Sequence, residues 1–232
     1  MNNGDTPSED IDRWNLAREL LDRALNVQSE AVERNIARAR QRRPDASPSD
    51  VIRTLGRMYR GALTSSGAAV GAAAAVPAVG TGVALALSGG EALTSLELSV
   101  LYALSLAEVH GVHIDDLERR RTLVLGVLLG GGSTETIKKM AERTGTHWAK
   151  QVINAVPVKT LRQINRVLGR NFVTKYGTRQ GIVVLGKIVP FGIGAVIGAG
   201  ANLTFAETTI RAANHAFGPP PLTWPHAPAN QN

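Results

Sequence analysis

A line of basic residues in the second half of the chain has a spacing suited to binding. Lys159, Arg162, Arg166 and Arg170 follow one another at intervals of three, four and four residues. These intervals place all four on one side of an α-helix, while apolar residues occupy the other angles. Such a helix suits an anionic lipid surface, although a solvated helix face would have the same pattern. The predicted anion- or lipid-binding residues are Lys159, Arg162, Arg166, Arg170, Lys175, Arg179 and Lys187.

Three glutamates, Glu91, Glu97 and Glu108, lie in an otherwise apolar segment. A buried carboxylate with a raised pKa can act as a general acid or base, and it can equally pair with an arginine inside a helical bundle. We favour the structural interpretation. The predicted ion pairs join Glu97 and Glu207 to Arg119, Arg120 and Arg121 or to Arg211.

Other kinds of chemistry have no recognisable motif in the sequence. The absence of Cys excludes disulfides, a thiolate nucleophile and Cys-ligated metals. His110, His113 and three acids at 115–118 lie close together, but their spacing matches no established metal site. The glycine-rich segment 130–134 lacks the Lys of a phosphate-binding loop, and no G-x-S-x-G nucleophile motif is present. We therefore expect no catalytic residues, no metal and no cofactor.

Helix signals recur along the chain, and alternating strand patterns are missing. The segments 6–9 and 47–50 each combine a capping side chain with a proline at the first helical position. Gly111 and an Asp at 115 or 116 separate two later helices. We predict an all-α, multi-helix globular bundle with Gly/Ala helix hairpins at its core. Its predicted divisions are a disordered N-terminus (1–7), an amphipathic helix (8–43), a helical domain (45–217) and a disordered Pro-rich tail (218–232).

Two long segments carry no charged residue. Residues 62–90 and 188–206 contain many Ala and Gly, and Pro77 divides the first of them. A membrane-spanning helix needs about 20 predominantly apolar residues, so we expect neither segment to form a stable span. Glycines four residues apart allow close helix packing in lipid or in a protein core. The predicted helix-packing glycines are Gly67, Gly71, Gly126, Gly130, Gly194 and Gly198.

The positive charge is concentrated late in the sequence. The net charge is +7, and residues 122–232 alone hold twelve Lys and Arg against three Glu. Residues 1–60 are nearly balanced, with eleven Arg against ten acids. An anionic partner is therefore expected at the later segment. Nucleic acid is a less suitable partner, because few aromatic residues lie among the charges and no binding motif is present.

The order of these features resembles the EcsC-like family. A small-residue hairpin with a Pro-Gly hinge precedes a Leu-rich helix that ends at His110-Gly111, and a basic helix follows. The closing block, VPFGIGAVIG at 189–198, is the most specific part, and Asn202 and Phe217 follow it. The resemblance covers about residues 45–217. It implies a helical, membrane-associated bacterial protein without an established activity, and it assigns no catalytic residues.

Three functional hypotheses remain. The first is a non-enzymatic, peripheral membrane-associated or accessory protein that binds an anionic surface or an acidic partner through residues 159–187. The second is an enzyme, such as a hydrolase, with an inter-helical pocket containing buried carboxylates such as Glu97. The third is a helical scaffold that forms homo-oligomers through residues 8–43. The polar, acidic start of the chain shows no signal peptide, so we expect a cytoplasmic location, peripheral at the inner face of the plasma membrane.

Overall fold

The computed structural model of the chain describes residues 19–26, 29–74, 81–130, 147–187 and 193–225. Within these ranges it also describes the surroundings of the side chains, except at 67–92, 173 and 175–199. No strand occurs in these ranges, which confirms the all-α prediction. A short helical stretch over 19–24 precedes the longer helices. These are α2 (Ser29–Arg40), α3 (Pro48–Ala74), α4 (Thr81–Val109), α5 (Leu117–Leu128), α7 (Trp148–Ala155), α8 (Val158–Lys187) and α9 (Ile193–Phe217).

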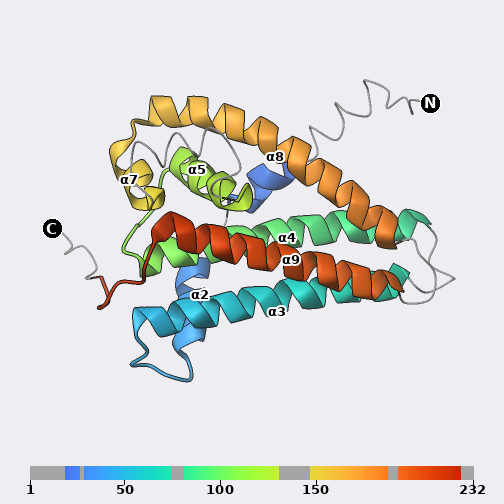
Figure 1. Cartoon of the computed structure of the whole chain (residues 1–232), viewed down its shortest axis with the longest axis horizontal. Helices are drawn as coiled ribbons and strands as arrows, with labels where there is room; N and C mark the ends of the chain where they lie inside the picture. Colours follow the sequence, from blue (N-terminus) through green and yellow to red (C-terminus); the bar gives the residue numbers. More distant parts are fainter. Residues whose placement is uncertain (1–18, 27–28, 75–80, 131–146, 188–192, 226–232) are drawn as a thin grey trace.

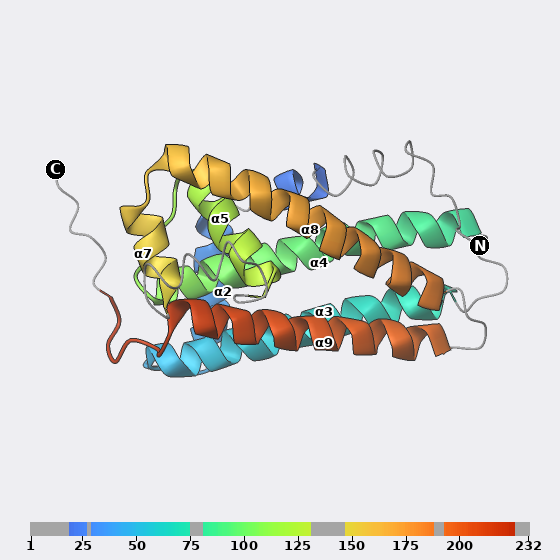
Figure 2. The same cartoon turned by 45° about the horizontal axis from the view of Figure 1, so that its top comes forward.

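The long helices form one elongated bundle (Figures 1 and 2). Helix α3 packs most extensively on α9 and next on α4, while α8 packs chiefly on α5 and on α9. The end of α3, the start of α4, the end of α8 and the start of α9 lie at the same end of the bundle in both views. The described helical parts of the two charge-free segments therefore come together at that end.

The helix boundaries follow local capping chemistry. The Ser47 hydroxyl accepts from the backbone N–H of Asp50 at 3.3 Å and donates to its carboxylate at 2.8 Å, and Pro48 is the first residue of α3. The Asp116 carboxylate accepts from the backbone N–H of Arg119 at 2.9 Å and caps α5. Gly111, just after α4, has a φ of 72°. The capping signals at these three places are confirmed.

The core combines aliphatic residues with a few aromatic rings. Trp148 and Phe172 are the largest of the fully buried side chains. The rings of Tyr59 and Tyr102 stack with centroids 4.7 Å apart, which joins α3 to α4. A buried polar contact also joins α9 to α3, because the Asn202 amide donates to the Leu63 carbonyl at 2.9 Å. This hydrogen bond compensates for the contacts with water that the amide and the carbonyl lose when they are buried on folding.

The predicted single helix over 8–43 is wrong for its described part. The helical stretch over 19–24 ends in a turn at Leu25 and Asn26, and α2 begins at Ser29. Leu25 and Val32 are both buried, so the break allows apolar residues of both stretches to reach the core. Residues 8–18 lie outside the described ranges, as does the predicted disordered segment 1–7.

The predicted disordered tail is wrong for residues 218–225. The Trp224 indole N–H donates to the Ala46 carbonyl at 3.0 Å, and the Arg40 guanidinium lies 4.7 Å from the centre of the indole ring. Gly218 has a φ of 80°, and a Cβ there would meet the His147 ring at 2.5 Å. Specific contacts therefore hold this segment against the bundle despite its proline content. Residues 226–232 lie outside the described ranges.

One of the three predicted glycine pairs is not a helix-packing pair. Gly126 is buried within α5, but Gly130 lies beyond the end of that helix with a φ of 82°. The two residues therefore do not share one helix face. The other pairs lie within single helices, and their packing is outside the described side chains: Gly67 and Gly71 in α3, and Gly194 and Gly198 in α9.

Candidate functional site

The first half of α8 has a buried side and a basic side. Leu161, Asn165, Leu168 and Phe172 are buried in the bundle. Val167 is 44% exposed on the outer side. The four basic residues predicted for this half are all exposed, and we call them the basic face: Lys159, Arg162, Arg166 and Arg170. The remaining predicted positions, Lys175, Arg179 and Lys187, belong to the second half of α8, where the side chains are not described.

Asn165 fixes the orientation of α8 on α5. This side chain is 5% exposed. Its amide oxygen accepts from the Thr122 hydroxyl at 2.7 Å, and its NH₂ group donates to the carbonyl of Glu118 at 2.9 Å and to the carboxylate of Glu118 at 2.7 Å. Asn165 lies between Arg162 and Arg166 in sequence but on the buried side of the helix. The hydrogen bonds therefore determine the direction in which the basic face points.

Most of the positive charge on the basic face is uncompensated by the described chain. Glu118 is the nearby carboxylate, with its Oε1 atom 4.0 Å from the Nε atom of Arg162. The same Oε1 atom lies 4.0 Å from Arg121, whose guanidinium also pairs with Asp22 at 2.5 Å. Within the described ranges, no ion pair involves the other three residues of the face: Lys159, Arg166 and Arg170.

The two predicted carboxylates do not pair with the arginines of α5. Glu207 on α9 pairs with Arg60 on α3, with 2.5 Å between Oε1 and Nε. Arg211 donates to the backbone carbonyl of Glu207 at 3.3 Å. Glu97 is exposed and has no ion pair among the described residues, so the hypothesis of a buried acid at this position is wrong. The packing of α9 on α3 explains why Glu207 faces Arg60.

The arginines of α5 have other partners. The Arg120 guanidinium donates to the Ile114 carbonyl at 2.7 Å and to the Ser29 hydroxyl at 3.3 Å. Arg121 pairs with Asp22. The Nη1 atom of Arg119 is buried and has no hydrogen-bond partner within the described part of the chain. Helix α5 therefore connects the segment before α2 to the bundle.

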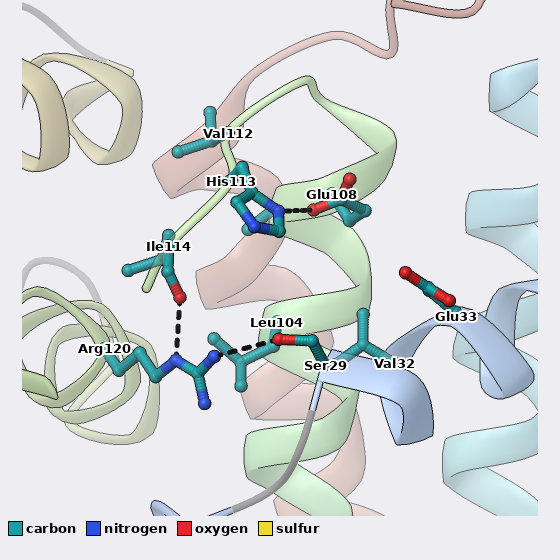
Figure 3. A pocket seen from close by; sticks show the side chains of 10 residues that line it. Ser29, Val32, Glu33, Leu104, Glu108, Val112, His113, Ile114 and Arg120 are labelled. Carbon is teal, nitrogen blue, oxygen red and sulfur yellow. Dashed lines mark hydrogen bonds and ion pairs between the residues drawn. The ribbon is translucent and has the colours of Figure 1, made fainter. Parts of the chain in front are cut away.

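His113 lies beside a small pocket between α2, α4 and α5 (Figure 3). Its ring nitrogens lie 2.9 Å from the Glu108 carboxylate and 3.1 Å from the Asp115 carboxylate. The hydrogen bond to Glu108 is the main reason that the pKa of His113 is raised. The pocket has a volume of about 30 Å³, which is room for about one or two water molecules. In the described ranges, no three metal-ligating side chains converge here or elsewhere.

Comparison with known proteins gives the family of the chain. None of the described helices has the length and apolar character needed to cross a membrane. The model of the EcsC protein family matches residues 24–218. The chain belongs to the EcsC family. No curated protein and no solved structure matches it. The match begins before residue 45, so α2 is part of the EcsC domain, contrary to the boundary expected from the resemblance.

A second basic surface of this EcsC protein was not predicted. A groove beside α2 and α3 offers about 1130 Å³ of space. The intervals of four and three residues between Arg53, Arg57 and Arg60 are a helical stripe that could have revealed it. Because the charges of residues 1–60 nearly balance, the net charge of this range gives no indication of the arginine stripe. We call this surface the arginine groove, after the arginines that line it: Arg38, Arg42, Arg43, Arg53, Arg57 and Arg60.

We predict that His110 makes the EcsC fold less stable in acid. Burial, with smaller contributions from Lys150 and His147, lowers the pKa of His110 to about 4. Its ring stacks on Phe217 with centroids 5.0 Å apart. The unfolded chain, with a pKa near 6.5, binds this proton first as the pH falls. The free energy of unfolding should therefore decrease between pH 6.5 and 4, by about 1–2 kcal/mol after allowance for partial exposure.

Urea denaturation of the His110→Gln variant at pH 7 and pH 4.5 tests this prediction. The variant should lose less stability on acidification than the parent chain. His113→Gln is the matched control, because the pKa of His113 is raised and its protonation stabilises the fold at low pH. The control should therefore lose more stability on acidification. An equal loss in all three proteins contradicts the assignment to His110.

Proposed function

We propose that this EcsC protein is a non-enzymatic, peripheral membrane-associated accessory protein. It binds the anionic surface of a bilayer through the basic face of α8. The observation that carries the proposal is the exposure of all four side chains on one side of a helix, with one glutamate in ion-pair range in the described structure. Lipid of the inner leaflet of the plasma membrane has the matching charge.

The expected strength of this interaction is sufficient for reversible binding. Each Lys or Arg near an anionic surface contributes about 1 kcal/mol, so the four residues together contribute about 4 kcal/mol. This corresponds to about a thousandfold increase in partition at low ionic strength. Val167 is 44% exposed between Arg166 and Arg170 and adds apolar contact with the interface. The hydrogen bonds of Asn165 hold the backbone of α8 against α5, so binding orders the basic side chains but not the helix that carries them.

Charge reversal on the basic face tests the proposal. The full chain should sediment with vesicles of 30% phosphatidylserine in phosphatidylcholine and should remain in the supernatant with pure phosphatidylcholine. The triple variant Arg162→Glu, Arg166→Glu and Arg170→Glu should bind the anionic vesicles at least about a hundredfold more weakly, because three attractions become repulsions. Binding by the parent chain should also decrease at 0.5 M salt, as is expected for exposed charges.

The arginine groove supplies a matched control. The triple variant Arg38→Glu, Arg42→Glu and Arg43→Glu changes the net charge by the same amount on another surface. It should retain vesicle binding to within about threefold, since only long-range attraction is lost. Equal losses in the two triple variants would mean that net charge determines binding and not the basic face. The same binding to neutral and anionic vesicles would also contradict the proposal.

A further inference from the structure

The arginine groove contains more positive charge than the described chain neutralises. Arg53 contacts Asp50, which is the one carboxylate among the described residues that line the groove. Arg60 pairs with Glu207 at 2.5 Å. Arg57 donates to the neutral hydroxyl of Thr54 at 3.1 Å. No carboxylate within the described ranges pairs with four of the six arginines: Arg38, Arg42, Arg43 and Arg57.

A buried hydroxyl lines the same groove. Tyr102 on α4 is 2% exposed, and its hydroxyl has no hydrogen-bond partner in the described part of the chain. Native proteins rarely leave a buried donor unsatisfied, so this group points to an external acceptor. Burial raises the pKa of Tyr102, so the hydroxyl remains protonated and can donate.

A glycine, Gly56, lies next to the Tyr102 hydroxyl. Gly56, near the middle of the first half of α3, also lines the groove. A Cβ at position 56 would lie 4.0 Å from the Tyr102 hydroxyl oxygen and 3.8 Å from Ile210, which is ordinary contact without overlap. A side chain would therefore fit at position 56 beside the hydroxyl. The hydroxyl oxygen itself is shielded from water, and the glycine adds no side chain to that shield.

We propose that the arginine groove binds a soluble small molecule with two or more phosphate groups. The planar guanidinium groups are suited to bidentate contacts with phosphate oxygens. The buried Tyr102 hydroxyl lies beside Gly56 at the base of the groove and supplies a neutral donor once the ligand displaces the atoms that cover it. The space of about 1130 Å³ accommodates a ligand with several charged groups. Nucleic acid is less suited, because the described lining of the groove has no exposed aromatic ring for stacking on bases, and its Tyr102 is buried.

The position of the groove favours a soluble ligand over a lipid headgroup. Helix α8 packs on α5, α9 and α4, and both views show its first half, which carries the basic face, on the side of the bundle opposite α3 (Figures 1 and 2). A molecule that contacts a bilayer through the basic face would therefore turn the arginine groove toward the aqueous phase. The binding proposed for the groove does not depend on that contact.

Calorimetric titration of pyrophosphate into the full chain tests the inference. Saturable binding to one site is expected at low ionic strength. Tyr102→Phe should weaken binding by about tenfold through the loss of one hydrogen bond to a charged acceptor, without lowering the thermal midpoint of the free protein. Arg42→Gln with Arg57→Gln should weaken binding by about a hundredfold. The matched double variant Arg162→Gln with Arg166→Gln should leave the affinity within about twofold, since its charges lie on the other side.

Two results would overturn the inference. One is the absence of saturable pyrophosphate binding, and the other is an equal loss of affinity in the two double variants. Sedimentation with 30% phosphatidylserine vesicles distinguishes the source of phosphate, because the groove variants should bind vesicles as the parent does. Loss of vesicle binding in the groove variants alone would assign the groove to lipid headgroups and reject the soluble ligand. Failure of the basic face in the vesicle assay leaves the pyrophosphate result unaffected.

Discussion

The Trp148→Ala variant is expected to lose about 4 kcal/mol of the free energy of unfolding, because it removes a fully buried indole ring and leaves a cavity. Trp148 is 0% exposed, and it begins α7, which packs on α9 and α5. Only two residues separate the end of α7 from the start of α8. Loss of this contact should therefore loosen the start of the helix that carries the basic face. Urea denaturation at pH 7 measures the change.

Trp148→Phe is the matched control for this prediction. It keeps an aromatic ring in the core and removes the indole N–H, which has no hydrogen-bond partner in the described part of the chain. The expected loss is about 1–2 kcal/mol, because part of the ring volume is lost but no satisfied hydrogen bond is broken. A loss below about 1 kcal/mol for Trp148→Ala would contradict the burial of this side chain.

The Asn165→Ala variant is expected to lose about 3 kcal/mol of the free energy of unfolding, because it removes three hydrogen bonds of a buried side chain and leaves a cavity between α5 and α8. Thr122 loses one of two acceptors, since its hydroxyl also contacts the Glu118 carbonyl at 2.9 Å, and both the carbonyl and the carboxylate of Glu118 lose a donor. The folded fraction should still bind anionic vesicles, because Asn165 lies on the buried side of α8. Urea denaturation and vesicle sedimentation on the same sample separate the effect on stability from the effect on binding.

Asn165→Asp provides a pH-dependent control. The new carboxylate keeps the shape of the side chain but lies beside the carboxylate of Glu118, which accepts a hydrogen bond at 2.7 Å from the native amide. Two ionised carboxylates at this separation repel each other, so the variant should be much less stable at pH 7. Part of the loss should be recovered at pH 4, where one of them binds a proton. A loss that does not change with pH contradicts the contact between Asn165 and Glu118.

The helices and the basic face could be predicted from the sequence because both depend on local spacing. Ser47 and Asp116 are capping residues whose partners lie three positions further along the chain. The intervals between Lys159, Arg162, Arg166 and Arg170 already place them on one side of any helix. The prediction was limited where distant segments determine the outcome, as for Trp224, whose indole bonds the carbonyl of a residue 178 positions away.

The ion pairs and the arginine groove depend on tertiary packing that spacing does not reveal. Glu207 and Arg60 are 147 positions apart, and they meet because α9 lies along α3. Glu97 lies on α4, whose sequence is apolar around much of its circumference, so spacing alone could not show which side faces water. The arginines of the groove come from the end of α2, from the loop that follows it and from one side of α3. The net charge of residues 1–60 does not show this concentration of arginines, because ten acids in the same range nearly cancel it.

The pairing of α3 with α9 has a consequence for the order in which the chain folds. Helix α3 follows α2 in the first part of the domain sequence and α9 is its last helix, and the Asn202 amide donates to a carbonyl 139 positions earlier. During synthesis, α3 emerges from the ribosome long before the helix that covers it. The charge-free second half of α3 therefore stays without α9 while the residues from α4 to α8 are translated, at about 5–20 residues per second. This half is rich in Ala and Gly, which are weakly apolar, and this limits premature association of the segment while its partner is still being made.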